Sequence, residues 1–227
     1  MLSAGPGSAM AAGLQAGASY FVPVAPQRFC DTRAGYGYTR LDANTIRVPI
    51  GNVRSVPGDA VAVALTLTGV NLWPGGNWLS AYPAGTTWPG TSSSNSESYY
   101  QAMANLVTVR LGSSLAVDIR SLKASEVIVD VSGYYVRATG EVRAGRLETT
   151  DPFRAIDTRT TGKIAAAGTI RVNLNGRLPA GALAVVANVT AVETDAGGFI
   201  TAYPLGVSLP EASNLNYGPG EIRAGAV

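Results

Sequence analysis

Histidine is absent from the 227-residue sequence, and cysteine occurs once, at Cys30. Without an imidazole the chain cannot build Ser–His–Asp or Cys–His catalysis, and it lacks the commonest zinc ligand. A lone cysteine excludes a disulfide within the chain, so cysteine usage does not reveal the compartment. The sequence therefore predicts a protein that is not an enzyme and holds no metal or other cofactor. We expect Cys30 to be a small buried side chain.

Charge and long apolar runs are scarce as well. Charged residues make up 14% of the chain and the formal net charge is +2, with no run of Lys or Arg. This pattern argues against a nucleic-acid partner. No stretch approaches the roughly 18 apolar residues that a membrane span requires. Residues 1–19 lack the basic start and apolar centre of a signal peptide.

A repeat organises almost all of the remaining sequence. Six short segments recur in the same order, at an offset that drifts from 126 down to 121 residues. The matched segments are 26–33 with 152–159, 46–48 with 170–172, 56–57 with 178–179, 60–68 with 182–190, 78–83 with 199–204 and 88–89 with 209–210. Such a period is the size of a domain and too long for a solenoid repeat. We therefore predict a flexible segment at 1–19, a first domain at 20–136, a linker at 137–146 and a second domain at 147–227.

Short apolar runs between turn residues indicate an all-β fold. The expected strands of the first copy are 21–24, 45–50, 60–70, 78–82, 104–111, 115–119 and 127–136. Several of these runs are β-branched and alternate apolar with polar residues, and no segment shows a helical stripe. Gly (27) and Pro (13) mark the turns between them. The prediction is two tandem antiparallel β-sandwich domains, or two small β-barrels.

The second copy is expected to be incomplete at its C-terminal end. Its last match places 224–227 on 104–107, so counterparts of 108–136 are missing. Open strand edges and an uncovered apolar face would follow. We favour the explanation that the chain is a fragment of a longer one that carries the missing strands. Alternatively, a protein partner or further copies of the same module supply strands to the open edge, or the second copy is poorly folded.

Several motifs resemble a repeat module found in large extracellular proteins of actinobacteria and related high-GC bacteria. The motifs that carry the resemblance are Asp31-Thr32-Arg33, Asp157-Thr158-Arg159, Ala187-Asn188-Val189-Thr190, Ala202-Tyr203-Pro204, Ser213-Asn214-Leu215-Asn216 and Asp130-Val131-Ser132-Gly133-Tyr134-Tyr135. The resemblance implies an exported, non-catalytic accessory or surface module, and it implies no particular ligand. The first copy departs from the pattern at Thr66, where the second has Asn188.

The Asp-Thr-Arg motif is the first candidate site. On a strand, Asp31 and Arg33 point to one face and Thr32 to the other. Either Asp31 and Arg33 bind a polar ligand, or they form a structural pair that fixes a corner between strands. We favour the structural pair. We expect Asp31 and Arg33, and likewise Asp157 and Arg159 in the second copy, to be largely buried. Asp118 and Asp130 are interpreted as solvated carboxylates on strand faces.

Aromatic residues in loops are the second candidate site, for a ligand or a protein partner. The residues in question are Trp73, Tyr36, Tyr38, Tyr99 and Tyr100. Such rings stack on sugar rings or anchor a protein contact. Trp78 and Trp88 align with Phe199 and Leu209, which favours a core or capping role for them.

Two functional hypotheses follow from these observations. The first is a structural or adhesive module of a cell surface or extracellular assembly, with a fibre or a virion as alternatives. The second is a carbohydrate-binding accessory domain of a secreted hydrolase, for which the partner is a glycan.

Overall fold

The computed structural model describes residues 19–71, 75–96, 102–138, 145–147 and 153–227. Within these residues the chain is all-β, as predicted, and its only helical element is the single 3-10 turn Ser113–Leu115. The strands are β1 (Ser19–Asp31), β2 (Thr39–Arg40), β3 (Thr45–Pro49), β4 (Ala60–Asn71), β5 (Asn77–Pro83), β6 (Ser94–Ser96), β7 (Ala102–Arg110), β8 (Ala116–Ser121), β9 (Ser125–Arg137), β10 (Asn188–Ala191), β11 (Gly198–Ile200), β12 (Leu215–Tyr217) and β13 (Arg223–Ala226).

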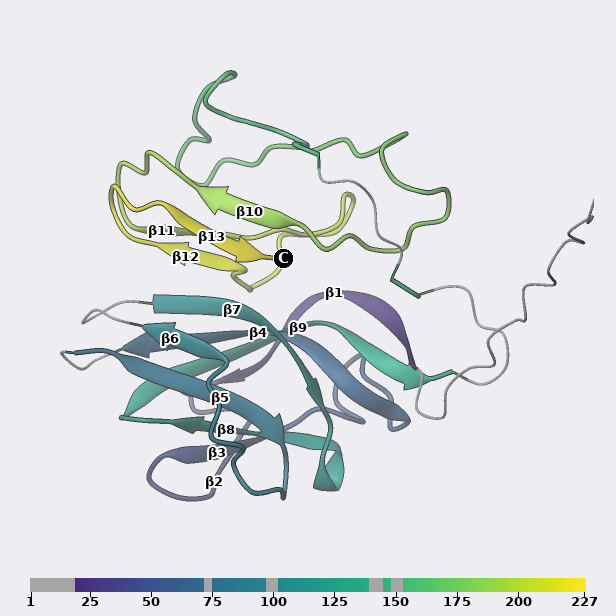
Figure 1. The fold of residues 1–227 in the computed structure, drawn as a ribbon, viewed down its shortest axis with the longest axis vertical. Helices are drawn as coiled ribbons and strands as arrows, with labels where there is room; N and C mark the ends of the chain where they lie inside the picture. Colours follow the sequence, from purple (N-terminus) through teal and green to yellow (C-terminus); the bar gives the residue numbers. More distant parts are fainter. Residues whose placement is uncertain (1–18, 72–74, 97–101, 139–144, 148–152) are drawn as a thin grey trace, which may run out of the picture.

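Strands β1 to β9 form two sheets packed face to face, which we call the first unit (19–137). One sheet has the order β1-β9-β4-β7 and the other the order β2-β3-β8-β5-β6. All pairings are antiparallel, and neither sheet closes on itself. The first unit is therefore a β-sandwich and not a barrel (Figure 1).

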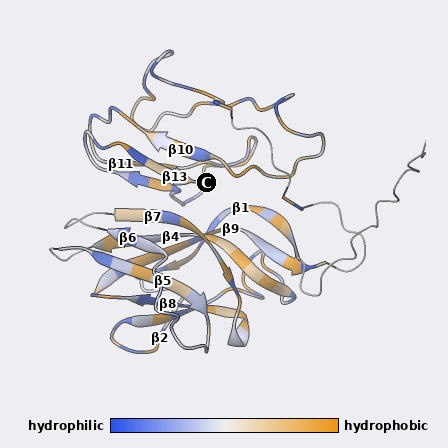
Figure 2. Ribbon diagram, in the orientation of Figure 1, coloured by the Kyte–Doolittle hydropathy of each residue, from blue (hydrophilic) through white to orange (hydrophobic). Residues whose placement is uncertain are grey.

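The alternating sequence of β4 shows why the two sheets stack. Val63, Leu65 and Leu67 are fully buried and belong to the core between the sheets. The intervening Thr66 and Thr68 point to the opposite face of the four-stranded sheet. Both threonines are also buried, because the outer face of this sheet is covered by the C-terminal part of the chain (Figure 1). Apolar and polar residues alternate along the strands of this sandwich (Figure 2).

Each of the seven apolar runs expected in the first copy coincides with one of the strands β1, β3, β4, β5, β7, β8 and β9, and three of them extend one residue beyond the strand, at Ile50, Leu111 and Leu115. The strands that sequence reasoning missed are β2 and β6, of two and three residues. They are the two edges of the five-stranded sheet. Strands this short carry no readable alternation, and short edges are one way in which proteins avoid edge-to-edge association.

Residues 153–227, which we call the second unit, contain two small sheets, β10-β13 and β11-β12. Phe199 is the register partner of Asn216, and Trp78 in the first unit is the register partner of Asn95. Each residue of the second pair lies 121 positions before its counterpart.

The same correspondence extends to side-chain hydrogen bonds. Asn214 Oδ1 accepts a hydrogen bond from the Ala202 N–H at 2.8 Å, and Ser93 Oγ accepts one from the Ala81 N–H at 3.0 Å. The backbone N–H groups of Asn214 and Ser93 also bond equivalent carbonyls, those of Ile200 and Leu79.

The second unit has less strand than expected. The described residues 153–187 contain none, although the repeat matches 170–172 to part of β3 and 182–187 to the first half of β4. In the first unit these strands bond to β8 and β9. In the described part of the second unit, 170–172 pairs with no strand, and 182–187 is bonded only at its end, where Ala187 and Val227 exchange backbone hydrogen bonds of 3.1 and 2.9 Å. Large apolar side chains are exposed throughout the second unit, among them Leu183, Val186, Phe199, Leu205, Leu209 and Ile222.

The second unit lies on the outer face of the four-stranded sheet of the first unit (Figure 1). Strands β12 and β13 contact β7. In the part of the chain that the structure describes, no helix is long and apolar enough to cross a membrane.

Candidate interaction site

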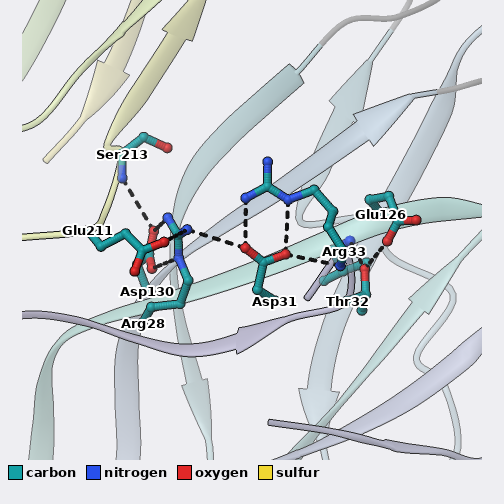
Figure 3. Close-up of polar contacts among 9 residues, drawn as sticks. Arg28, Asp31, Thr32, Arg33, Glu126, Asp130, Glu211 and Ser213 are labelled. Atoms are coloured by element: carbon teal, nitrogen blue, oxygen red, sulfur yellow. Dashed lines mark hydrogen bonds and ion pairs between the residues drawn. The ribbon is translucent and has the colours of Figure 1, made fainter. Parts of the chain in front are cut away.

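A network of charged side chains joins the two units (Figure 3). Arg28 of β1 donates from Nε to Asp130 Oδ1 at 2.9 Å and from Nη2 to Asp130 Oδ2 at 3.3 Å. Its Nη1 contacts Asp31 Oδ2 at 3.3 Å and Glu211 Oε1 at 3.1 Å. The backbone N–H of Ser213 donates to Asp130 Oδ2 at 3.3 Å. One guanidinium therefore binds carboxylates from β1, from β9 and from the second unit.

The segment that docks on this network is residues 212–215. All four of its residues are buried, with Leu215 only 1% exposed. Asp130 lies on the outer face of β9, next to Thr66 of β4, which is its register partner. The side chain of Asp130 is 2% exposed and that of Arg28 is 10% exposed. The ion pair is thus shielded from water by the second unit.

The Asp-Thr-Arg motif forms a compact clamp at the end of β1. Asp31 Oδ1 accepts hydrogen bonds from the Arg33 N–H and Nε at 3.0 and 2.9 Å, and Oδ2 accepts one from Nη2 at 2.7 Å. The carbonyl of Asp31 accepts the N–H groups of Ala34 and Tyr36, which closes the turn. Gly37 then approaches β1 with φ +81°, where an added Cβ would lie 2.0 Å from the Phe29 carbonyl oxygen. Only glycine fits that position.

The expected burial of the clamp holds for one side chain of the pair and is wrong for the other. The Asp31 side chain is 6% exposed, whereas that of Arg33 is 49% exposed. The carboxylate sits at the covered interface, and the longer guanidinium reaches it from the solvent side. The motif was expected to lie on a strand, but β1 ends at Asp31, and Thr32 and Arg33 lie in the turn that follows it. The Thr32 hydroxyl donates to Glu126 and accepts from the Val127 N–H.

The pKa values of two carboxylates in this network are shifted in opposite directions. Hydrogen bonding to Arg33 lowers the pKa of Asp31. Burial raises the pKa of Asp130, although its hydrogen bonds with Arg28 and the Ser213 N–H favour the ionised form. Burial also raises the pKa of Cys30 to about 12, with the charges of Asp31 and Asp130 acting in the same direction. Cys30 is fully buried, as expected, and its thiol is not activated.

The second unit carries the same clamp in a solvent-facing position. Asp157 accepts from the Arg159 N–H, Nε and Nη2 at 3.1, 2.9 and 2.6 Å, and from Arg154 Nη1 at 2.7 Å. These hydrogen bonds lower the pKa of Asp157, led by that from the Arg159 side chain. The side chains of Arg154, Asp157 and Arg159 are 68%, 20% and 51% exposed, so the expected burial fails here for the arginine of the motif.

The interpretation of Asp118 and Asp130 as solvated carboxylates is wrong. Asp130 is covered by the second unit, and Asp118 is 4% exposed at its side chain. Asp118 accepts two hydrogen bonds from Arg47, at 2.7 and 2.9 Å, and one from the Gly85 N–H at 3.1 Å. Each carboxylate lies on an outer sheet face but is paired with an arginine of the adjacent strand. Arg28 is the register partner of Asp130, and Arg47 is the register partner of Asp118. Such cross-strand pairing cannot be read before the register is known.

The aromatic candidates lie in different places. Tyr36 is 37% exposed, and burial followed by the nearby charge of Glu211 raises its pKa. Tyr38 packs against the core, with the Arg40 guanidinium 6.0 Å from its ring centroid. The remaining three, Trp73, Tyr99 and Tyr100, lie outside the described residues.

Sequence reasoning missed the role of Arg28, and for Trp78 and Trp88 it gave the capping role as one of two alternatives but not the contact between the rings. Arg28 recurs as Arg154 in the repeat, and that recurrence was the available signal for the network. Trp78 and Trp88 stack with ring centroids 5.1 Å apart and planes 5° apart, and the Arg120 guanidinium lies 5.7 Å from the Trp88 ring centroid. Trp88 remains 37% exposed, so this pair caps the outer face of the five-stranded sheet and is not part of the core.

Comparison with protein families, with curated proteins and with solved structures gives no match. Among the described residues, no group of three or more Cys, Asp or Glu side chains is placed to hold a metal ion.

Proposed function

We propose that this protein is a non-catalytic structural or adhesive module of a bacterial cell surface or extracellular assembly, with a fibre or virion component included in that class. In this proposal the second unit is a partial copy of the first. The module works by docking one unit on the outer sheet face of another.

The correspondence between the units supports the proposed repeat. The clamp at Asp31 and the clamp at Asp157 make the same three hydrogen bonds to an arginine two residues later. The strand pair β5-β6 has the register of β11-β12. Matching sequence, register and side-chain bonds are what two copies of one unit would show.

The observation that carries the proposal is the buried ion pair between Arg28 and Asp130 under residues 212–215. A buried charge is tolerated only when it is paired and hydrogen-bonded. Here the second unit supplies the backbone N–H of Ser213 and the burial itself. A sheet face that needs a neighbouring unit to complete its polar contacts is suited to assembly of units in a row.

Docking can be tested by a substitution under the segment that covers the pair. Thr66 is 2% exposed beside Asp130, so Thr66→Arg should displace the second unit. We expect a larger radius of gyration in small-angle X-ray scattering and faster proteolysis within 153–227. Thr108→Arg is the matched control, because Thr108 belongs to the same sheet but is exposed. Unchanged scattering and proteolysis in Thr66→Arg would contradict the docking role.

The proposed location rests on the resemblance of the repeat to extracellular modules and needs its own test. An antibody against the chain should label intact, unpermeabilised cells or the isolated extracellular assembly. Labelling only after permeabilisation would contradict the proposal.

A carbohydrate-binding function is the second candidate, and one observation favours it. The stacked Trp78 and Trp88, with Arg120 beside them, form a partly exposed aromatic pair on a sheet face. Indole rings bind sugars through their faces and edges. A glycan array tests this candidate, with Trp88→Ala expected to abolish any signal. Leu209→Ala, at the matched position of the second unit, should leave the signal unchanged.

A further inference from the structure

A cavity of about 180 Å³ opens at the end of the first unit, on the side of the Asp-Thr-Arg motif that faces away from the interface. It lies between the turn that joins β2 to β3 and the turn that joins β8 to β9. Thr32 of the motif lines it, and its other lining residues are Arg40, Ala43, Asn44, Ile46, Ile119, Ser121, Ala124, Ser125, Glu126 and Val127.

The cavity combines an apolar floor with polar groups at its rim. Ile46, Ile119 and Val127 belong to the core, and they are at most 5% exposed. A hollow with an apolar floor and a few convergent polar groups is the usual form of a small-molecule site. The volume is below that of a drug-sized pocket, which sets the ligand at the size of a single amino acid.

The rim carries one charge of each sign. Glu126 Oε2 accepts a hydrogen bond from the Thr32 hydroxyl, and its Oε1 accepts none from the described residues. The Arg40 guanidinium contacts the Tyr38 ring and forms no hydrogen bond or ion pair with the described residues. Asn44 donates to the Leu122 carbonyl, which leaves its own amide oxygen as an acceptor.

These features select the class of ligand. A carboxylate and a guanidinium on one rim match a molecule with an ammonium group and a carboxylate group. The apolar floor matches a short aliphatic side chain. The lining contains no aromatic ring, so it offers no stacking surface for a sugar. We infer that this cavity binds a small zwitterion, a neutral amino acid with a short aliphatic side chain.

Titration of the whole chain with valine, followed by amide NMR shifts, tests the inference. We expect saturable shifts confined to residues 43–46 and 121–127. N-acetylvaline lacks the ammonium group and valinamide lacks the carboxylate, so each should bind at least about tenfold more weakly than valine. Glucose should give no saturable shift.

Variants separate the cavity from the rest of the molecule. Glu126→Gln and Arg40→Gln should each weaken valine binding by at least about tenfold. Ala124→Phe should block the cavity without removing a charge. Glu193→Gln and Arg110→Gln are the matched controls on exposed sites elsewhere and should bind like the unmodified chain.

Each variant is first checked by circular dichroism, so that loss of fold is not mistaken for loss of binding. The inference is overturned if about 10 mM valine, a concentration in the range of weak small-molecule binding, shifts no amide of the cavity. It is also overturned if N-acetylvaline and valinamide bind as well as valine, or if Ala124→Phe binds normally. The inference is independent of the proposed surface function.

Discussion

Removal of the Arg28 guanidinium should destabilise the protein more than loss of any exposed charge. In Arg28→Met, Asp130 keeps a 2% exposed carboxylate whose remaining donor is the Ser213 N–H. Breaking a buried ion pair from one side costs about 3–5 kcal/mol, because the other charge stays buried without its partner. For a chain of this length that cost corresponds to a fall in melting temperature of roughly 6–20 °C. Urea denaturation followed by tryptophan fluorescence measures the free energy of unfolding directly.

Two controls make the assignment specific. Arg154→Met removes the matching arginine of the second unit, which is 68% exposed, and should have little effect. The double variant Arg28→Met with Asp130→Leu removes both charges, so it should recover most of the loss, since apolar replacement of a buried pair is often neutral.

A pH series adds a third control. The loss in free energy of unfolding caused by Arg28→Met should be smaller at pH ~4 than at pH ~7, because at the higher pH the buried Asp130 carboxyl must ionise without its partner. The reasoning is refuted if Arg28→Met loses less than about 1 kcal/mol, which is the range of an exposed pair. It is refuted equally if the double variant is no more stable than the single one.

Four further predictions concern Asp31, Asp130, Cys30 and Leu67. The advantage of the unmodified chain over Asp31→Asn should be complete above about pH 4, the ordinary pKa of an aspartate, and should be lost as the pH falls below that value through the lowered folded-state pKa of Asp31. The opposite sign is expected for Asp130→Asn, because the raised pKa of Asp130 makes its contribution largest at low pH and diminishes it as the pH rises; urea denaturation at a series of pH values measures both. The Cys30 thiol, with a pKa of about 12, should react with a thiol-specific reagent in urea and not in the folded protein, and ready reaction in buffer would contradict its burial. Leu67→Ala should cost about 2–5 kcal/mol by thermal or urea denaturation, since Leu67 is fully buried, whereas Leu209→Ala, at a 66% exposed side chain, should cost far less.

The sequence by itself determined the all-β class and the positions of the long strands. Alternation such as Val63, Leu65 and Leu67 against Thr66 and Thr68 fixes both strand and inward face, because side chains alternate along an extended backbone. The internal repeat also directed attention to Asp31 and Asp157. The clamp itself is not a strand feature, because Arg33 lies in the turn after β1, where the Asp31 carboxylate accepts the N–H of the residue two positions later.

Only the tertiary structure decided which distant groups meet. Asp130 and Asp118 read as exposed strand-face carboxylates because nothing near them in sequence pairs with them. The β1-β9 and β3-β8 registers bring Arg28 and Arg47 beside them, across separations of 102 and 71 residues. The burial of Asp130 further depends on residues 212–215, which lie in a different unit. Periodicity reports which face a side chain takes, whereas the partner on that face is set by strand register and by docking, both of which are long-range properties.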